Sequence, residues 1–322
     1  MNRRFFVRSL LAVAALAGPA LAQSDFPTRP IRFVVTVPAG GTQDASARAV
    51  ANQMSNQMGQ TIVIDNRGGA NGIIGSDIVA KAAPDGYTLL YTAIAFIVLP
   101  SAYKNLPFDI NKDFIPITNT ATGQGVLIVV NASSPLRSVK ELIEAAKKSE
   151  LVYGSPGRSN GMHLLTELFS HRAGIKMLPV VYKGTGPELA ALMANEIQLM
   201  LIPPVVVQQQ IKAGRLRALG YSGSKRFEGL PDVPTVEEAG VANFTIGSGW
   251  HAVFAPARTP APVIDKLYRE IHKALQAPAL RKFYQDGGYE VVGEPPAQFQ
   301  KTFQADVKKW GEIARLAGVR PE

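Results

Sequence analysis

The stretch IRFVVTVPAGGTQDASARAVANQMSNQMG, residues 31–59, combines three local signals in order. Residues 31–38 are rich in β-branched side chains, which favour an extended strand. A glycine-rich turn follows, and then a helical pattern that keeps its apolar residues near one face and ends at Gly59, a typical C-cap. A strand that leads directly into an amphipathic helix predicts an α/β fold.

The same alternation of strand and helix continues along the chain. Further β-branched runs occupy residues 61–66, 87–93, 125–131, 151–155, 178–184, 197–203 and 216–222. One of the helical patterns between them opens with Ser138 and Glu141, which have the spacing of a capping box. Two long amphipathic patterns, 261–278 and 297–318, end the chain. This regularity predicts mostly parallel sheets flanked by helices.

A break in the alternation predicts two lobes. The series restarts near residue 125 after FIPITNTATGQG, and a strand pattern returns in NFTIGSGWHAVFAPARTP. We therefore expect residues 23–124 and 247–322 to form lobe 1 and residues 125–246 to form lobe 2, joined by two crossing segments. Open α/β sheets bind ligands beyond the carboxyl ends of their strands, so a ligand cleft is expected between the lobes.

The first 22 residues form a separate segment. Arg3, Arg4 and Arg8 precede the short apolar run LLAVAALAGPA, and Ala-Leu-Ala at 20–22 matches an A-x-A cleavage site. This pattern predicts a cleaved signal peptide, and the shortness of the run argues against a membrane anchor. The arginine pair also resembles a twin-arginine signal, so the leader is compatible with export by either the Sec or the Tat pathway. We expect an exported, periplasmic protein.

Composition excludes several kinds of chemistry. The chain has no cysteine, which excludes disulfides, thiolate metal sites and a cysteine nucleophile. Its formal net charge of +9 falls to +6 without the three leader arginines, and the remaining Lys and Arg residues are scattered. A nucleic-acid partner is therefore not expected. Because no His, Asp and Glu residues have metal-ligand spacing, no metal or other cofactor is expected either.

The glycine-rich turn at 38–48 is a candidate anion site. Its glycines allow a close approach of the backbone to a ligand, and the free N–H groups and dipole of the helix favour a negative charge. The turn has neither nucleotide-phosphate motif, G-x-x-x-x-G-K-[ST] or G-x-G-x-x-G. An ordinary turn capped by Asp44 is the alternative. The residues expected to contribute are Gly40, Gly41, Thr42, Gln43 and Asp44.

Two other glycine-rich segments also precede helical patterns. Residues 66–76 are interpreted as a structural turn, whereas residues 181–188 place Thr185 at a second helix start.

The segment GRSNG, residues 157–161, matches the G-x-S-x-G nucleophile elbow of α/β-hydrolases. A serine hydrolase also needs a histidine base, an acid that orients it and an oxyanion hole. His163 follows on the next helix, where it is poorly placed to act as the base, and no oxyanion loop is recognisable. Ser155, Ser159 and Asn160 are better interpreted as donors of hydrogen bonds to an anion. Hydrolysis through Ser159 stays open as an alternative.

Several blocks of the chain resemble one family of receptors. PAGGTQDASAR, AAPDGYTLL, YGSPGRSNGMH, VYKGTGPELAALMANEIQLM and LPDVPTVEEAG are similar to segments of the Bug family, the TctC-like solute receptors of tripartite tricarboxylate transporters. The resemblance covers essentially all of the chain after the leader. It implies a two-lobed, type II-like periplasmic binding fold, a Venus flytrap that closes around a small carboxylate. It also implies a monomer that passes its ligand to a two-component membrane permease.

The resemblance also implies which residues hold the carboxylate. In such receptors two loops bind the carboxylate. The PAGGxxD loop corresponds here to residues 40–44, and the S-x-G loop of the second lobe corresponds to residues from Ser155 to His163. We place with them the end of the strand at 87–93 and the helix start at Thr185. The additional expected residues are Thr92, Ala93, Ser155, Gly157, Arg158, Ser159, Asn160 and His163.

Departures from the family pattern suggest a ligand class. After GYTLL the chain has YTAIAFIVLPSAY, in which Ile94, Phe96 and Leu99 replace small polar residues. We interpret this run as an apolar wall, which would suit an aromatic carboxylate or dicarboxylate, or a long aliphatic diacid. Arg158 could hold a distal carboxylate bidentately. The alternatives are that the run is buried and that Arg158 faces solvent. A sensory receptor that feeds a signalling partner is an alternative to transport.

Overall fold

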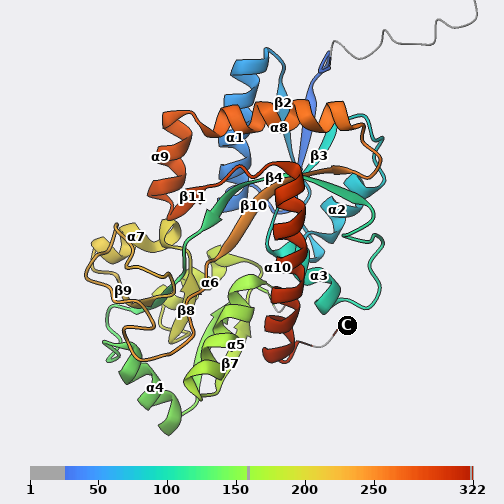
Figure 1. Cartoon of the computed structure of the whole chain (residues 1–322). Coiled ribbons are helices and arrows are strands. Elements are labelled where there is room, and N and C mark those ends of the chain that lie inside the picture. Colours follow the sequence, from blue (N-terminus) through green and yellow to red (C-terminus); the bar gives the residue numbers. More distant parts are fainter. Residues whose placement is uncertain (1–25, 158–159, 320, 322) are drawn as a thin grey trace, which may run out of the picture.

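The computed structural model describes residues 26–157, 160–319 and 321, and shows two α/β lobes (Figure 1). The predicted leader, residues 1–22, lies outside the described residues. The chain runs through lobe 1 first, crosses to lobe 2 and returns to lobe 1. The two-lobed architecture expected from the sequence is therefore confirmed.

The sheet of lobe 1 has the order β11-β4-β10-β3-β1-β2. Its strands are β1 (Ile31–Val35), β2 (Ile62–Asn66), β3 (Thr88–Ala93), β4 (Phe114–Gly123), β10 (Gly249–Pro256) and β11 (Tyr289–Val291). The sheet of lobe 2 has the order β7-β6-β8-β5-β9. Its strands are β5 (Leu127–Asn131), β6 (Leu151–Ser155), β7 (Met177–Val181), β8 (Leu199–Ile202) and β9 (Leu216–Tyr221).

Both sheets are mixed, so the expectation of mostly parallel sheets was wrong. In lobe 1, β1 pairs in parallel with β2 and β3, but β10 pairs antiparallel with β3 and β4. In lobe 2, β6 is parallel to β7 and β8, but β5 is antiparallel to β8 and β9. The reversed strands lie next to the crossings, where the chain leaves one sheet and enters the other. The boundaries of the lobes at 124/125 and 246/247 stay a prediction, and the strands of each sheet fall on one side of them.

Helices cover both faces of the sheet in lobe 1. Because side chains alternate along a strand, Phe33 and Val35 pack toward one face while Val34 packs toward the other. The helices are α1 (Thr42–Met58) and α8 (Ala261–Leu275) on the first face, and α2 (Ile73–Ala80), α3 (Ala95–Ala102) and α10 (Pro296–Leu316) on the second. The short helix η1 (Ala70–Gly72) precedes α2, and α9 (Pro278–Asp286) precedes β11.

Lobe 2 has the same sandwich construction. Its helices are α6 (Thr185–Met193) and α7 (Pro204–Lys212) on one face, and α4 (Val139–Lys148) and α5 (Gly161–Ala173) on the other. The predicted capping box begins α4, where the backbone N–H of Glu141 donates to Ser138 Oγ at 3.1 Å. The Glu141 carboxylate accepts from the backbone N–H of Arg137, at 2.7 Å, one residue before the N-cap. The short edge strand β7 exposes Leu178, Val180 and Val181.

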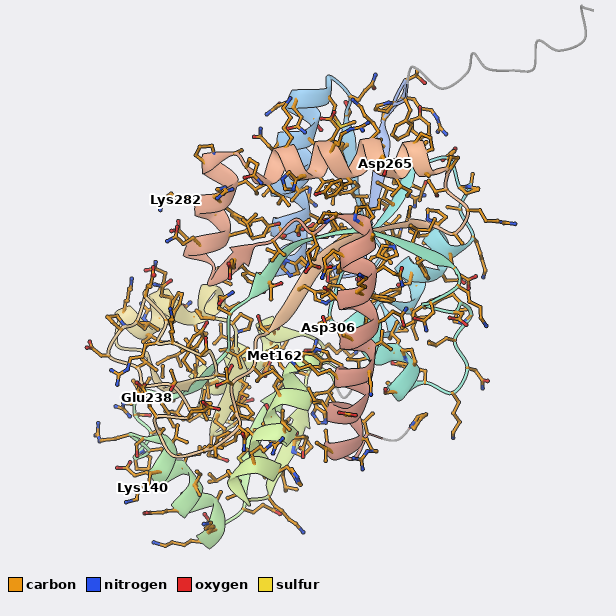
Figure 2. All side chains as sticks on the ribbon, viewed as in Figure 1. Lys140, Met162, Glu238, Asp265, Lys282 and Asp306 are labelled. Atoms are coloured by element: carbon orange, nitrogen blue, oxygen red, sulfur yellow. The ribbon has the colours of Figure 1, made fainter. Side chains whose placement is uncertain are left out.

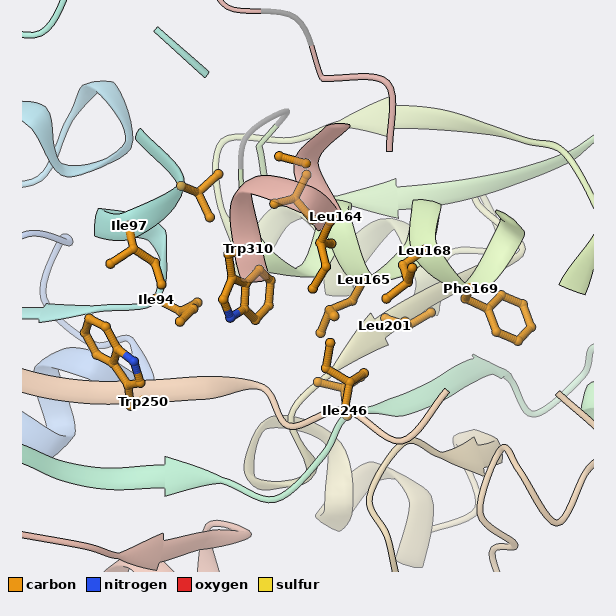
Figure 3. Packing of buried hydrophobic residues seen from close by; sticks show 14 of the residues in the cluster. Ile94, Ile97, Leu164, Leu165, Leu168, Phe169, Leu201, Ile246, Trp250 and Trp310 are labelled. Carbon is orange, nitrogen blue, oxygen red and sulfur yellow. The ribbon is translucent and has the colours of Figure 1, made fainter. Parts of the chain in front are cut away.

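The C-terminal helix α10 joins the two lobes. Its Phe299 and Phe303 pack against Phe254 of β10, whereas Trp310 belongs to the same buried cluster as Leu164 of α5. Figure 3 shows the indole of Trp310 between Ile94 of lobe 1 and the leucines of α5 in lobe 2. One hydrophobic cluster therefore extends through both lobes.

Candidate functional site

The glycine-rich loop of lobe 1 leads into α1 as the sequence predicts. Gly40 and Gly41 are exposed, and Gly41 is the N-cap of α1 without a capping side chain. The first-turn N–H groups of such a helix have no intrahelical acceptor and favour an anion. This loop therefore presents the kind of donor that a carboxylate needs.

Asp44 supports this loop from behind and does not cap the helix. One carboxylate oxygen accepts from the backbone N–H of Gly40 at 2.9 Å and from Arg48 Nε at 3.0 Å. The other accepts from Asn66 Nδ2 at 2.8 Å. Burial alone would raise the pKa of Asp44, but these hydrogen bonds outweigh it and hold the pKa below its ordinary value. Asp44 thus fixes the shape of the loop.

Gln43 and Thr92 also point into the protein. The amide of Gln43 donates to Thr36 Oγ1 and to the carbonyl oxygen of Tyr91, both at 2.9 Å. The hydroxyls of Thr36 and Thr92 lie 3.1 Å apart. We call Gln43, Thr36, Thr92 and Asp44 the lobe 1 support, because all four are buried behind the loop. Thr42 and Ala93, which are half-buried, complete the expected residues of lobe 1.

Hydrogen bonds within lobe 2 hold the described residues of its glycine-rich loop. The buried Ser155 hydroxyl donates to the carbonyl of Gly157 at 3.0 Å, and the N–H of Asn160 donates to the same carbonyl. The side chain of Asn160 caps α5 by accepting from the N–H of Met162 at 2.9 Å. Arg158 and Ser159, which the sequence analysis also assigned to the site, lie outside the described residues.

His163 lies on the first turn of α5 and is largely buried. Its Nδ1 is 3.1 Å from the hydroxyl of Tyr153, which also hydrogen-bonds to Glu167. This contact directs one ring nitrogen of His163 toward the interior of lobe 2. The contact also joins α5 to β6, because Tyr153 lies on β6.

A carboxylic acid that the sequence did not single out lies behind the glycine-rich loop of lobe 2. Glu188, on the first turn of α6, is 1% exposed, and neither carboxylate oxygen has a hydrogen-bond partner in the described part of the chain. A β-carbon placed on Gly154 would lie 2.8 Å from its Cγ. Burial raises the pKa of Glu188 to about 8. Thr185, three residues earlier, is half-buried at the start of the same helix.

The apolar run after β3 forms core, which overturns its interpretation as a wall of the cleft. Phe96 is 1% exposed and packs against the rings of Phe108, Phe114 and Phe254. Leu99 is buried in the same cluster. The run forms α3, a helix that packs against η1 and α10 and buries its large apolar side chains.

The turn at 66–76 contributes a residue that the sequence analysis missed. A β-carbon placed on Gly157 of lobe 2 would lie 3.4 Å from Oδ1 of Asn71 in lobe 1. The two lobes therefore meet at this point, beside the second glycine-rich loop. Asn71 lies at a positive φ of 53°, which is the only local feature that marks it.

These elements define the chemistry that the site offers. Helices α1 and α5 begin at glycine-rich loops of different lobes, and the uncapped start of α1 offers backbone donors to an anion, whereas the start of α5 is capped by Asn160. Within the described residues, no three His, Asp or Glu side chains could hold a metal ion. Over the same residues, no helix has the length and apolar character needed to cross a bilayer.

Two α/β sandwiches, joined by two crossings and with helix starts at their boundary, define the class of periplasmic binding proteins. Residues 46–319 match the family described as the tripartite tricarboxylate transporter family receptor, TctC. The chain therefore belongs to this family, as the resemblance to Bug receptors implied.

Relatives support this assignment over nearly the whole chain. The protein encoded in the tcbD–tcbE intergenic region of Pseudomonas sp. strain P51 is 36% identical over 97% of this chain and 93% of its own length. BugT of Bordetella pertussis is 33% identical over 96% of this chain and 95% of its own.

Solved structures with similar sequences have the same fold. Rpa4515 of R. palustris, determined with adipate, has a TM-score of 0.86 and 32% identity, and the match covers 92% of this chain and 100% of that chain. MatC of Rhodopseudomonas palustris, with bound malate, has a TM-score of 0.80 and 28% identity, over 89% of this chain and 99% of that chain.

Proposed function

We propose that this protein is a solute-binding receptor that captures a small dicarboxylate between its lobes. The observation that carries the proposal is the uncapped start of α1 at Gly41, held in shape by Asp44. Backbone N–H groups at this helix start would bind one carboxylate, and the loop of lobe 2 would bind the other end of the ligand. The protein would bind its ligand without converting it.

An aliphatic diacid of the length of adipate is the ligand class that we favour. The structural relative at 32% identity binds adipate, and the relative at 28% identity binds malate. An aromatic carboxylate or dicarboxylate has lost its main support, because Phe96 and Leu99 lie in the core.

The partner and the location follow from the family. We propose that the leader at 1–22 directs the chain to the periplasm and is removed there, by Sec or by Tat. The receptor would then act as a monomer and deliver its ligand to a two-component membrane permease.

Thermal unfolding with a panel of acids tests the proposal. The panel contains adipate, succinate, malate, citrate, benzoate, phthalate and glutamate. A ligand at 100 times its dissociation constant stabilises the folded protein by about 2.7 kcal/mol, which gives an easily measured rise in melting temperature. We expect the largest rise with adipate or another dicarboxylate.

No rise with any acid, in a protein that unfolds cooperatively, would contradict the proposal. Stable labelling of Ser159 by a phosphonofluoridate would instead support the hydrolase alternative.

A further inference from the structure

A small pocket lies beside the start of α1, where lobe 1 faces lobe 2. Thr42 and Ser46, four residues apart on one face of α1, form one side of it. Phe283 of α9 forms another side, and Val205 of α7 reaches the pocket from lobe 2, below α9 in Figure 1. Figure 2 shows Lys282 on the outer surface of α9, so this helix presents an aromatic ring to the pocket and its charge to solvent.

His251 of β10 also lines this pocket. Its side chain is 5% exposed, and its ring stacks on that of Tyr289 with the centroids 5.0 Å apart. Its Nδ1 is buried without a hydrogen-bond partner in the described part of the chain. Burial lowers the pKa of His251 from 6.5 to about 4, so the imidazole is uncharged at neutral pH.

The hydroxyl groups next to His251 are bonded to one another. The hydroxyl of Ser46 lies 2.6 Å from that of Tyr91 and 2.8 Å from that of Tyr284, which also lines the pocket. The hydroxyl of Thr120 lies 3.0 Å from that of Tyr91. A buried polar group without a partner costs free energy, so a bound molecule that hydrogen-bonds to the imidazole of His251 would recover this cost.

The size and charge of the pocket limit what it can bind. Its volume of about 20 Å³ suits a group the size of one water molecule. None of its described lining residues is charged at neutral pH, so it has no cationic partner for a carboxylate. A neutral imidazole has one donor and one acceptor, and a hydroxyl can both donate and accept. A hydroxyl group therefore matches the pocket in size, charge and hydrogen bonding.

We propose that this pocket is a subsite for a hydroxyl group of the ligand, which hydrogen-bonds to the imidazole of His251. Because Thr42 belongs both to the pocket and to the first turn of α1, this hydroxyl lies close to the carboxylate that the helix start binds. The inference rests on the proposed function and narrows its ligand class to diacids that carry a hydroxyl group near one carboxylate.

Three acids of the same chain length test the subsite in the unaltered protein. Malate, methylsuccinate and succinate carry a hydroxyl group, a methyl group and a hydrogen atom at the same carbon. Calorimetry with each enantiomer of the first two gives the affinities. We expect malate to bind about threefold to tenfold more tightly than succinate, the range for one hydrogen bond, and methylsuccinate to show no such gain.

Substitutions of His251 test which residue causes the preference. His251→Phe removes both ring nitrogens and keeps an aromatic ring against Tyr289, so the preference for malate over succinate should disappear. His272→Phe is the matched control, because His272 is half-buried on α8 of the same lobe and does not line the pocket. His251→Gln returns a donor and an acceptor to this position and should recover part of the preference.

Equal affinity for malate and succinate, or an equal gain with methylsuccinate, would overturn the subsite and leave the proposed function in place. A preference for malate that persists in both His251→Phe and His251→Gln at full size would overturn the role of His251. If the unaltered protein binds neither these acids nor adipate, the proposed function fails, and the subsite fails with it.

Discussion

The two loops that we propose to bind the ligand are built differently. The loop of lobe 1 is fixed by its own lobe, through the buried carboxylate of Asp44 and the amide of Gln43. The described residues of the lobe 2 loop are held by the Ser155 hydroxyl, by the Asn160 cap and by the N–H of Tyr182, which donates to the carbonyl of Ser155, and Trp310 of lobe 1 lies close to Gly161. One loop is therefore held by a buried charged group, whereas the described part of the other is held by neutral hydrogen bonds and lies close to the opposite lobe.

Under the proposed function, the helix start of lobe 1 would bind a carboxylate and the loop of lobe 2 would contact the rest of the ligand. Substitutions in the two loops should accordingly have different consequences.

Trp310→Ala should have the largest effect. The indole is 3% exposed and packs close to Gly161, the first residue of α5. Its removal should lower the free energy of unfolding by about 3–5 kcal/mol, the usual cost of a large aromatic cavity. Urea denaturation measures this loss, with Trp310→Phe as a milder control. A loss below 1 kcal/mol would show that lobe 2 does not need this contact.

Glu188→Gln should change how stability depends on pH. Since burial raises the pKa of Glu188 to about 8 from 4.5, the folded protein holds a proton that the unfolded chain loses. Stability should be fully present below pH 4.5 and fall by up to a few kcal/mol as pH rises toward about 8. Glutamine stays neutral, so the variant should lose this decline.

Melting temperatures between pH 4 and 9 measure the effect, with the exposed Glu144→Gln as the control. If Glu188→Gln and the unaltered protein have the same pH profile, the carboxylate of Glu188 is stabilised by hydrogen-bond partners in lobe 2.

Asp44→Ala should damage the loop of lobe 1. It removes three hydrogen bonds to a charged group, and a loss of about 2–3 kcal/mol is expected together with weaker ligand binding. Because its pKa is lowered, the contribution of Asp44 is present above the ordinary value of 3.8 and lost at lower pH. Asp286→Ala, which breaks the exposed pair with Lys282, should cost no more than about 1 kcal/mol.

Asn160→Ala should have the smallest effect on stability. Loss of a helix cap costs about 1 kcal/mol, and Ser138→Ala at the start of α4 should cost the same. Only Asn160 adjoins the second loop, so only its variant should weaken adipate binding. Equal binding by both variants, measured by calorimetry, would show that this cap has no part in the site.

The sequence predicted most of the fold because its signals are local. Alternating strand and helix patterns located β1 and α1, and the capping box at Ser138 located the start of α4. The direction of pairing was not predictable in this way. Whether β10 enters the sheet parallel or antiparallel depends on residues far apart in the chain, and its own pattern is the same in either case.

The prediction of the binding site from the sequence was limited in the same way. The glycine-rich turn at 38–48 identified the helix start of lobe 1, since free N–H groups need no tertiary partner. The run containing Phe96 misled the prediction, because an apolar residue in a core and one in a binding wall look alike in a sequence. Asn71 was missed because Gly157, the residue of the other lobe near its amide oxygen, is distant in the chain.

The order of strands has a consequence for how the nascent chain folds. The strands of lobe 2 are all synthesised by Tyr221, whereas β10, which separates β3 from β4 in lobe 1, ends at Pro256. Lobe 2 can therefore fold as a unit before β10, the strand that pairs with both β3 and β4, has been synthesised. During that interval the apolar edges of lobe 1 are open to wrong pairing, so the inserted lobe is expected to fold first and the enclosing lobe last.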